Sequence, residues 1–151
     1  MIEIREATQK DLLGMMELYT HLNSNPFSQI DDRIKDIWNK ILNDKNRHTL
    51  IICDSGKIAA SVTLFINESL VKGQRPFALV EYVVTHPEYR GNGFAKKLMA
   101  EAQQIAEQNN CYKTMLITGQ SDETVHRFYQ KAGYKSQGKT AYVKELEERL
   151  I

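Results

Sequence analysis

The first third of the chain carries hydrophobic residues at spacings that predict one short strand and two helices. Ile2 and Ile4 alternate with polar residues, as in a half-buried strand. Two later stretches place hydrophobic residues three and four positions apart, the spacing of one helix face. They follow helix-capping sequences at residues 8–11 and 28–31, and residues 23–26 interrupt them. The hydrophobic positions of the two predicted helices are Leu12, Met15, Met16, Tyr19 and Leu22, and Ile30, Ile34, Ile37, Trp38 and Ile41.

The middle of the chain changes from helical spacing to strand-like runs. Residues 49–53, 58–66 and 77–85 are rich in hydrophobic and β-branched side chains. The first two runs are joined by Asp-Ser-Gly-Lys at residues 54–57, which is typical of a hairpin turn. These runs predict an antiparallel meander.

The last third of the chain alternates between the two patterns. A helical stripe that starts at Phe94 ends near residues 109–110, and residues 112–118 predict a strand. Residues 122–132 predict a fourth helix, followed by two strands, one from residue 134 and one over residues 140–145. This order predicts an α/β (α+β) layer structure. We expect a mixed, mostly antiparallel central sheet of about six to seven strands, flanked by about four helices.

Length and charge narrow the class of protein. The 151 residues fit a single domain spanning 1–151. The 20 Lys and Arg residues almost cancel the 19 Asp and Glu residues, and the resulting net charge of +1 argues against a nucleic-acid partner.

Other classes are disfavoured by what the sequence lacks. No leader segment and no apolar stretch long enough to span a bilayer occurs, so we expect a cytoplasmic protein with no membrane partner. The two cysteines and four histidines show no metal-ligand spacing, so we expect no metal site.

A glycine-containing loop lies between the third strand-like run and the next helix. Residues 90–95 read Arg-Gly-Asn-Gly-Phe-Ala. Its two glycines permit a sharp turn, and the N–H groups at a helix N-terminus bind phosphate well. The dinucleotide fingerprint needs a third glycine where Lys96 stands, and the Gly-Lys-Ser/Thr of a Walker loop is absent. Taken alone, the loop is either a pyrophosphate site or a plain strand-to-helix turn.

The residues around this loop resemble the GNAT superfamily of N-acetyltransferases. The stretch 80–95 is similar to its motif A, Arg/Gln-x-x-Gly-x-Gly/Ala, through Arg90, Gly93 and Ala95. The stretch 122–134 resembles a second signature, Asn-x-x-Ala-x-x-Phe-Tyr-x-x-x-Gly-Phe, with Asp122 and Val125 in place of Asn and Ala. The order of elements matches too, so the resemblance covers essentially the whole chain and implies the GNAT fold.

The resemblance implies acetyl-CoA as the co-substrate. Its pyrophosphate would lie on the backbone amides of the glycine loop, and its pantetheine arm would pair with the exposed edge of the preceding strand. The second signature would add contacts from its helix. The implied cofactor-binding residues are Val83, Val84, Thr85, Arg90, Gly91, Asn92, Gly93, Phe94, Ala95, Lys96, Asp122 and Phe128.

The resemblance also implies two catalytic residues. A protonated amine near pKa ~10 is not a nucleophile, so a base must take its proton. Glu81, in an otherwise apolar run, is the candidate base; the alternative is a strand carboxylate in a salt bridge. Tyr129 matches the tyrosine that acts as the acid in the family, and the alternative is a core aromatic residue.

The acceptor is less specified than the reaction, because one fold serves many acceptors. The resemblance implies an amine acceptor, either a small molecule or a peptide, and a possible homodimer. Residues 80–84, 89–91, 111–113 and 128–134 are similar to glucosamine-6-phosphate N-acetyltransferases, although Tyr82 stands where those enzymes have an acidic residue. A non-catalytic acetyl-CoA-binding module is the alternative of another class.

Two loops are expected to form the acceptor surface. They cover residues 23–31 and 67–76. In the second loop, Lys72 and Arg75 are either ligands for an acidic substrate or ordinary solvated charges.

Overall fold

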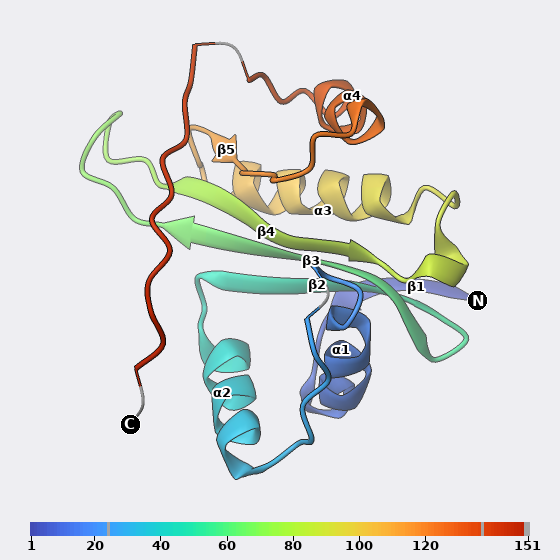
Figure 1. Cartoon of the computed structure of the whole chain (residues 1–151). Helices are drawn as coiled ribbons and strands as arrows, with labels where there is room; N and C mark the ends of the chain where they lie inside the picture. The colour runs from blue at the N-terminus through green and yellow to red at the C-terminus, as the bar shows by residue number, and fades with distance from the viewer. Residues whose placement is uncertain (24, 137, 150–151) are drawn as a thin grey trace. The chain divides into compact units, whose positions relative to one another are not determined.

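A five-stranded sheet with helices on both of its faces forms the larger part of the molecule (Figure 1). The computed structural model describes residues 1–23, 25–136 and 138–149. The chain divides into two compact units, Met1–Leu116 and Ile117–Ile151. The elements of the first unit are β1 (Ile2–Glu6), a 3-10 turn (Gln9–Asp11), α1 (Leu12–Tyr19), α2 (Asp32–Asn43), β2 (Arg47–Asp54), β3 (Lys57–Asn67), β4 (Phe77–Thr85), a second 3-10 turn (Pro87–Tyr89), α3 (Phe94–Gln108) and β5 (Thr114–Met115).

The strands lie in the sheet in the order in which they occur in the sequence. Neighbours from β1 to β4 are antiparallel, which confirms the predicted meander. Strand β5 pairs with β4 in parallel, as expected for strands connected through α3. The sheet is therefore mixed and mostly antiparallel, as predicted.

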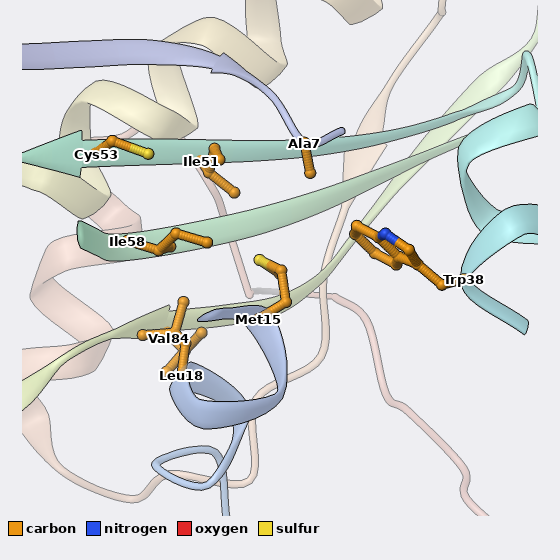
Figure 2. Close-up of a cluster of buried hydrophobic side chains, with 8 residues drawn as sticks. All are labelled: Ala7, Met15, Leu18, Trp38, Ile51, Cys53, Ile58 and Val84. Atoms are coloured by element: carbon orange, nitrogen blue, oxygen red, sulfur yellow. The ribbon is translucent and has the colours of Figure 1, made fainter. Parts of the chain in front are cut away.

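The two faces of the sheet are covered by different helices. Helices α1 and α2 pack on one face and α3 packs on the other (Figure 1). The cluster on the α1/α2 face is shown in Figure 2 and consists of Ala7, Met15, Leu18, Trp38, Ile51, Cys53, Ile58 and Val84. Strand residues that alternate with this set, such as Leu50, Ile52 and Val62, are fully or almost fully buried as well. Both faces of the central strands are thus apolar, as required by a sheet between two helical layers.

The described residues of the second unit form one helix, α4 (Glu123–Lys131). The carboxylate of Asp122 accepts a hydrogen bond from the N–H of Thr124 at 2.7 Å and caps this helix. The helix ends before Gly133, which has a positive φ of 95° as is usual after a helix C-terminus. The four α-helices found among the described residues agree with the prediction. No helix in the described part of the chain is long and apolar enough to cross a membrane.

The sheet has five strands rather than the predicted six to seven. The predicted strand at residues 112–118 shortens to Thr114–Met115, and the described residues between 134 and 149 form no strand. In this last segment, Tyr142 and Val143 are 92% and 69% exposed. The sequence pattern predicted strands here, but a strand also needs a neighbouring strand that forms hydrogen bonds with its backbone N–H and C=O groups. Residue 137, within the predicted strands, lies outside the described residues.

The starts of the first two helices differ in how well they were predicted. At residues 8–11, the carboxylate of Asp11 accepts hydrogen bonds from the N–H and the hydroxyl of Thr8, which confirms the capping box. At α2 the cap is Asp31, whose carboxylate accepts from the N–H of Ile34, so the helix starts later than the Ser28 prediction. The predicted break at residues 23–26 includes residue 24, which lies outside the described residues.

An ion pair between Arg5 and Asp11 ties β1 to the start of α1. The guanidinium of Arg5 donates to both carboxylate oxygens of Asp11 at 2.7 and 3.0 Å. Burial alone would raise the pKa of the Asp11 carboxyl, but the hydrogen bonds from Arg5 and Thr8 outweigh it and lower the pKa. Because the folded-state pKa lies below the unfolded one, this stabilisation is present at neutral pH. It is lost as the pH falls below about 4.

We therefore expect Asp11→Asn to lower the free energy of unfolding by about 1–3 kcal/mol at pH 7, because charged hydrogen bonds to a buried carboxylate are lost. Urea denaturation at pH 7 and near pH 3 measures it, and the difference from wild type should shrink at the lower pH. Asp36→Asn, at an exposed position of α2, is the matched control. An equal loss at both pH values would contradict the ionic origin of the effect.

Candidate active site

Strand β4 contains one extra residue relative to its partner β3. Ser61 pairs with Val84 and Thr63 pairs with Glu81, so two steps along β3 correspond to three along β4. Tyr82 lies in this interval with a φ of 55°, a left-handed conformation that is uncommon outside glycine. This combination is a β-bulge, a feature that bends the strand carrying it.

The far edge of β4 is paired for only a short distance. Strand β5 pairs with β4 at Ala78 and Leu79, and no further pairing between these strands is formed in the described residues. The stretch beyond includes Val83, Val84 and Thr85, the residues that the resemblance assigns to the pantetheine arm. An unpaired strand edge offers N–H and C=O groups to an extended ligand.

The glycine loop continues directly from this edge. Gly91 and Gly93 adopt φ values of 83° and 73°, which side-chain-bearing residues rarely adopt. The Asn92 side-chain amide donates to the carbonyl of Tyr89 at 2.8 Å and closes the turn. Arg90 and the three residues that follow it are exposed.

Helix α3 begins at this loop without a side-chain cap. Its N-cap is Gly93, whereas α2 and α4 start at aspartates whose carboxylates accept a backbone N–H. The first N–H groups of a helix have no acceptor within the helix. At α3 these belong to Phe94, Ala95 and Lys96. An open helix N-terminus beside exposed glycine amides is suited to a phosphate group.

The loop is held against the sheet by contacts on its N-terminal side. The N–H of His86 donates to the carbonyl of Ala59 at 2.8 Å. Lys57 forms an ion pair with Glu88 at 2.9 Å, and the ring of Tyr89 stacks on that of Phe94 with 6.1 Å between centroids. The turn therefore has a defined position at the end of β4.

Glu81 lies on the α1/α2 face of the sheet beside the bulge. It pairs across the strands with Thr63 and is half buried. In the described part of the chain it forms neither an ion pair nor a hydrogen bond, so the alternative of a salt-bridged strand carboxylate is not realised there. Its carboxylate is available to take a proton from a ligand.

Aromatic rings and one arginine lie close to one another on the same face of the sheet. The ring of Tyr82 lies 6.1 Å from that of Tyr19 and 6.5 Å from that of Phe65, and the Arg47 guanidinium lies 4.7 Å above Phe65. Tyr19 was predicted as a hydrophobic position of the first helix, and Tyr82 was noted only because an acidic residue was expected there. No role was predicted for Phe65 or Arg47. The cross-strand register, which the sequence does not show, is what brings them together.

The second unit holds the remaining predicted site residues. In α4, Tyr129 is half buried, and its ring contacts those of Phe128 and Tyr134. Burial, with a smaller contribution from Tyr134, raises the pKa of the Tyr129 phenol, which favours its protonated form. Asp122 serves as the cap of α4. The structure thus brings Glu81, the β4 edge and the glycine loop together within the first unit.

The two basic residues of the β3–β4 loop have different environments. Arg75 donates to the carbonyls of Asn110 and Cys111 at 3.1 and 3.0 Å, where it holds the end of the α3 region. Lys72 is exposed. Among the described residues, no three His, Cys, Asp or Glu side chains gather as in a metal site.

Comparisons with known proteins agree with this geometry. The family model described as the acetyltransferase (GNAT) family matches residues 12–134. A solved structure of a protein from Agrobacterium tumefaciens, assigned as an acetyltransferase, superposes with a TM-score of 0.89 at 34% identity, over 95% of this chain and 99% of that one.

Two curated relatives add named activities. The glucosamine 6-phosphate N-acetyltransferase of Trypanosoma brucei brucei is 29% identical over 89% of this chain and 90% of its own length. The aminoalkylphosphonate N-acetyltransferase of Salmonella typhimurium is 28% identical over 88% of this chain and 84% of its own length.

Proposed function

The chain belongs to the GNAT family of acetyltransferases, and we propose that it transfers the acetyl group of acetyl-CoA directly to a primary amine of a small molecule. The observation that carries this proposal is the continuous track formed by the unpaired edge of β4 and the uncapped start of α3. Because the family match spans both units, we also propose that residues 1–151 work as one acetyltransferase domain.

The residues of this track fit the two ends of acetyl-CoA. The amides from Arg90 to Lys96 would bind the pyrophosphate, since residues 90–93 are exposed and lead into a helix without a side-chain cap. The backbone of Val83, Val84 and Thr85 would hydrogen-bond the pantetheine arm as a further strand does. Acetyl-CoA supplies the activated acyl group. The chain supplies its position beside Glu81.

Glu81 would act as the general base. It takes a proton from the acceptor ammonium, directly or through a water, which leaves a neutral amine that can attack the acyl carbon. A backbone N–H near Val83 or Val84 would donate a hydrogen bond to the oxygen that becomes negatively charged.

Tyr129 would act on the leaving group. A thiol is more acidic than a tyrosine phenol by about 1.5 pK units, and burial raises the pKa of Tyr129 further. Its hydroxyl therefore stabilises the departing thiolate by donating a hydrogen bond at least as readily as by complete proton transfer. Asp122 and Phe128 would position the helix that carries it.

The curated relatives support one class of acceptor. Their names describe substrates that combine a primary amine with a phosphate or a phosphonate. We propose that the acceptor of this chain is a small primary amine that carries such an oxyanion, with glucosamine 6-phosphate as the first candidate.

The proposed activity is tested by incubating the purified protein with acetyl-CoA and a panel of amines and measuring CoA release and product by mass spectrometry. We expect turnover of a phosphorylated or phosphonylated amine, and slower turnover of polyamines, amino acids, aminoglycosides and peptides. Turnover confined to peptides or polyamines would refute the acceptor class. Acetyl-CoA binding without turnover of any amine would instead support a non-catalytic module.

We expect Glu81→Gln to lower kcat about a hundredfold, the contribution of a positioned base, while the Kd for acetyl-CoA stays the same. Steady-state kinetics and calorimetric titration measure the two quantities. Glu107→Gln, at an exposed position of α3, is the control. Unchanged turnover of Glu81→Gln across the pH range would eliminate Glu81 as the base.

Tyr129→Phe removes one hydroxyl, and we expect it to slow the release of CoA at least tenfold because the leaving thiolate loses its donor. Single-turnover measurements of CoA release follow the step. Tyr142→Phe removes a hydroxyl from a side chain that is 92% exposed and is the matched control. A wild-type rate for Tyr129→Phe would make this residue structural.

A further inference from the structure

The register of the sheet places Arg47 on the same face as the proposed base. Arg47 pairs with Phe65, which pairs with Leu79, and Thr49 pairs with Thr63, which pairs with Glu81. These are two parallel rows of side chains across β2, β3 and β4. Side chains two positions apart on a strand point to the same face, so the rows project toward α1 and α2.

Arg47 is a cation without a protein acceptor. Its Nε is buried and has no hydrogen-bond partner, and the guanidinium forms no ion pair in the described part of the chain. It is held over the ring of Phe65 at 4.7 Å. A buried polar group that lacks a partner is destabilising and rare in proteins. A guanidinium fixed by an aromatic ring with its donors unused is well suited to bind an anion from outside the chain.

The surroundings of Arg47 are partly open and contain further donors. Burial raises the pKa of the Tyr19 phenol, while nearby Thr63 and the positive charge of Arg47 act in the opposite direction, so these groups lie within electrostatic reach of one another. Tyr82, whose ring contacts those of Tyr19 and Phe65, is 42% exposed. Tyr19, Tyr82 and Phe65 thus form one group of aromatic rings beside Arg47.

We propose that Arg47 is the anion-binding residue of the acceptor site, and that its guanidinium binds the phosphate or phosphonate oxygens while the acceptor amine reaches Glu81. The identity of the acceptor rests on the proposed function, but the position of its anionic group follows from the sheet. Arg47 and Glu81 are two strands apart and one row apart, which separates their Cα atoms by about 12 Å. Both side chains project from the same face of the sheet, on either side of β3, so a small molecule with an amine at one end and an oxyanion at the other can lie across β3 and reach both.

The two basic residues of the β3–β4 loop are less suited to the role. Arg75 already donates to two backbone carbonyls. Lys72 is an exposed point charge on a loop. Arg47 combines a fixed fork of donors with partial burial, which strengthens its interaction with an anion because water screens it less.

The first test compares two acceptors that differ only in the anion. With glucosamine 6-phosphate, Arg47→Gln should raise KM at least tenfold, and with glucosamine it should leave kcat/KM within twofold of wild type. Arg47→Lys should recover part of the loss because it keeps the charge. Arg33→Gln, at an exposed position of α2, is the matched control and should change neither value. Equal losses with both sugars, or no loss with either, would overturn the proposal.

The second test does not depend on turnover. Wild-type protein saturated with CoA, so that the glycine loop is occupied, is titrated with inorganic phosphate while the Nε–H resonances of its arginines are followed by NMR. We expect a saturable shift of the Arg47 resonance, assigned by its absence in Arg47→Lys. An unshifted Arg47 resonance would refute the anion site even if glucosamine 6-phosphate is acetylated. A shift in a protein that acetylates no amine would refute the proposed function and leave the anion site standing.

Discussion

The single residue inserted into β4 at Tyr82 is the constraint on which the rest of the site depends. A regular strand can pair with a strand on each side along its whole length. The bulge bends β4 and changes the alternation of its side chains between Glu81 and Val84. One irregularity thereby accounts for both halves of the site. It leaves an edge on which an extended ligand can lie, and it sets a carboxylate and an aromatic ring side by side on the α1/α2 face.

The N-termini of the helices differ in whether a side chain accepts their first N–H groups. Asp31 and Asp122 close the N-termini of α2 and α4 with their own carboxylates. Gly93 leaves that of α3 open. The aspartate in the second family signature is thus explained within its own unit as a cap, and it keeps the accepting side-chain oxygen of the asparagine that it replaces.

The sequence was sufficient for features that depend on local chemistry. The bounds of β4 at residues 77–85, the glycine turn at 90–95 and the helix from Phe94 follow from side-chain alternation, turn residues and helical spacing. The bulge at Tyr82 was not predictable, because its left-handed backbone is imposed by packing on β3 and not by its residue type. Arg47 was not predicted for a related reason, because only the strand register shows that it lies across from Phe65. The strands predicted after residue 134 are not formed in the described residues. The alternation of side chains does not show whether the edge of a neighbouring strand is available for pairing.

The first N–H groups of α3 have no acceptor within the helix, and a ligand that binds there supplies one. Helix α3 packs on β2, β3 and β4, so it belongs to the main hydrophobic layer and not to a peripheral lid. An anion that satisfies its terminal N–H groups contributes to the same layer that keeps the sheet folded. By mass action, a ligand at a hundred times its Kd adds about 2.7 kcal/mol to the stability of the folded state. The binding of CoA or acetyl-CoA proposed for this helix N-terminus should therefore raise the resistance of the protein to unfolding and to proteolysis.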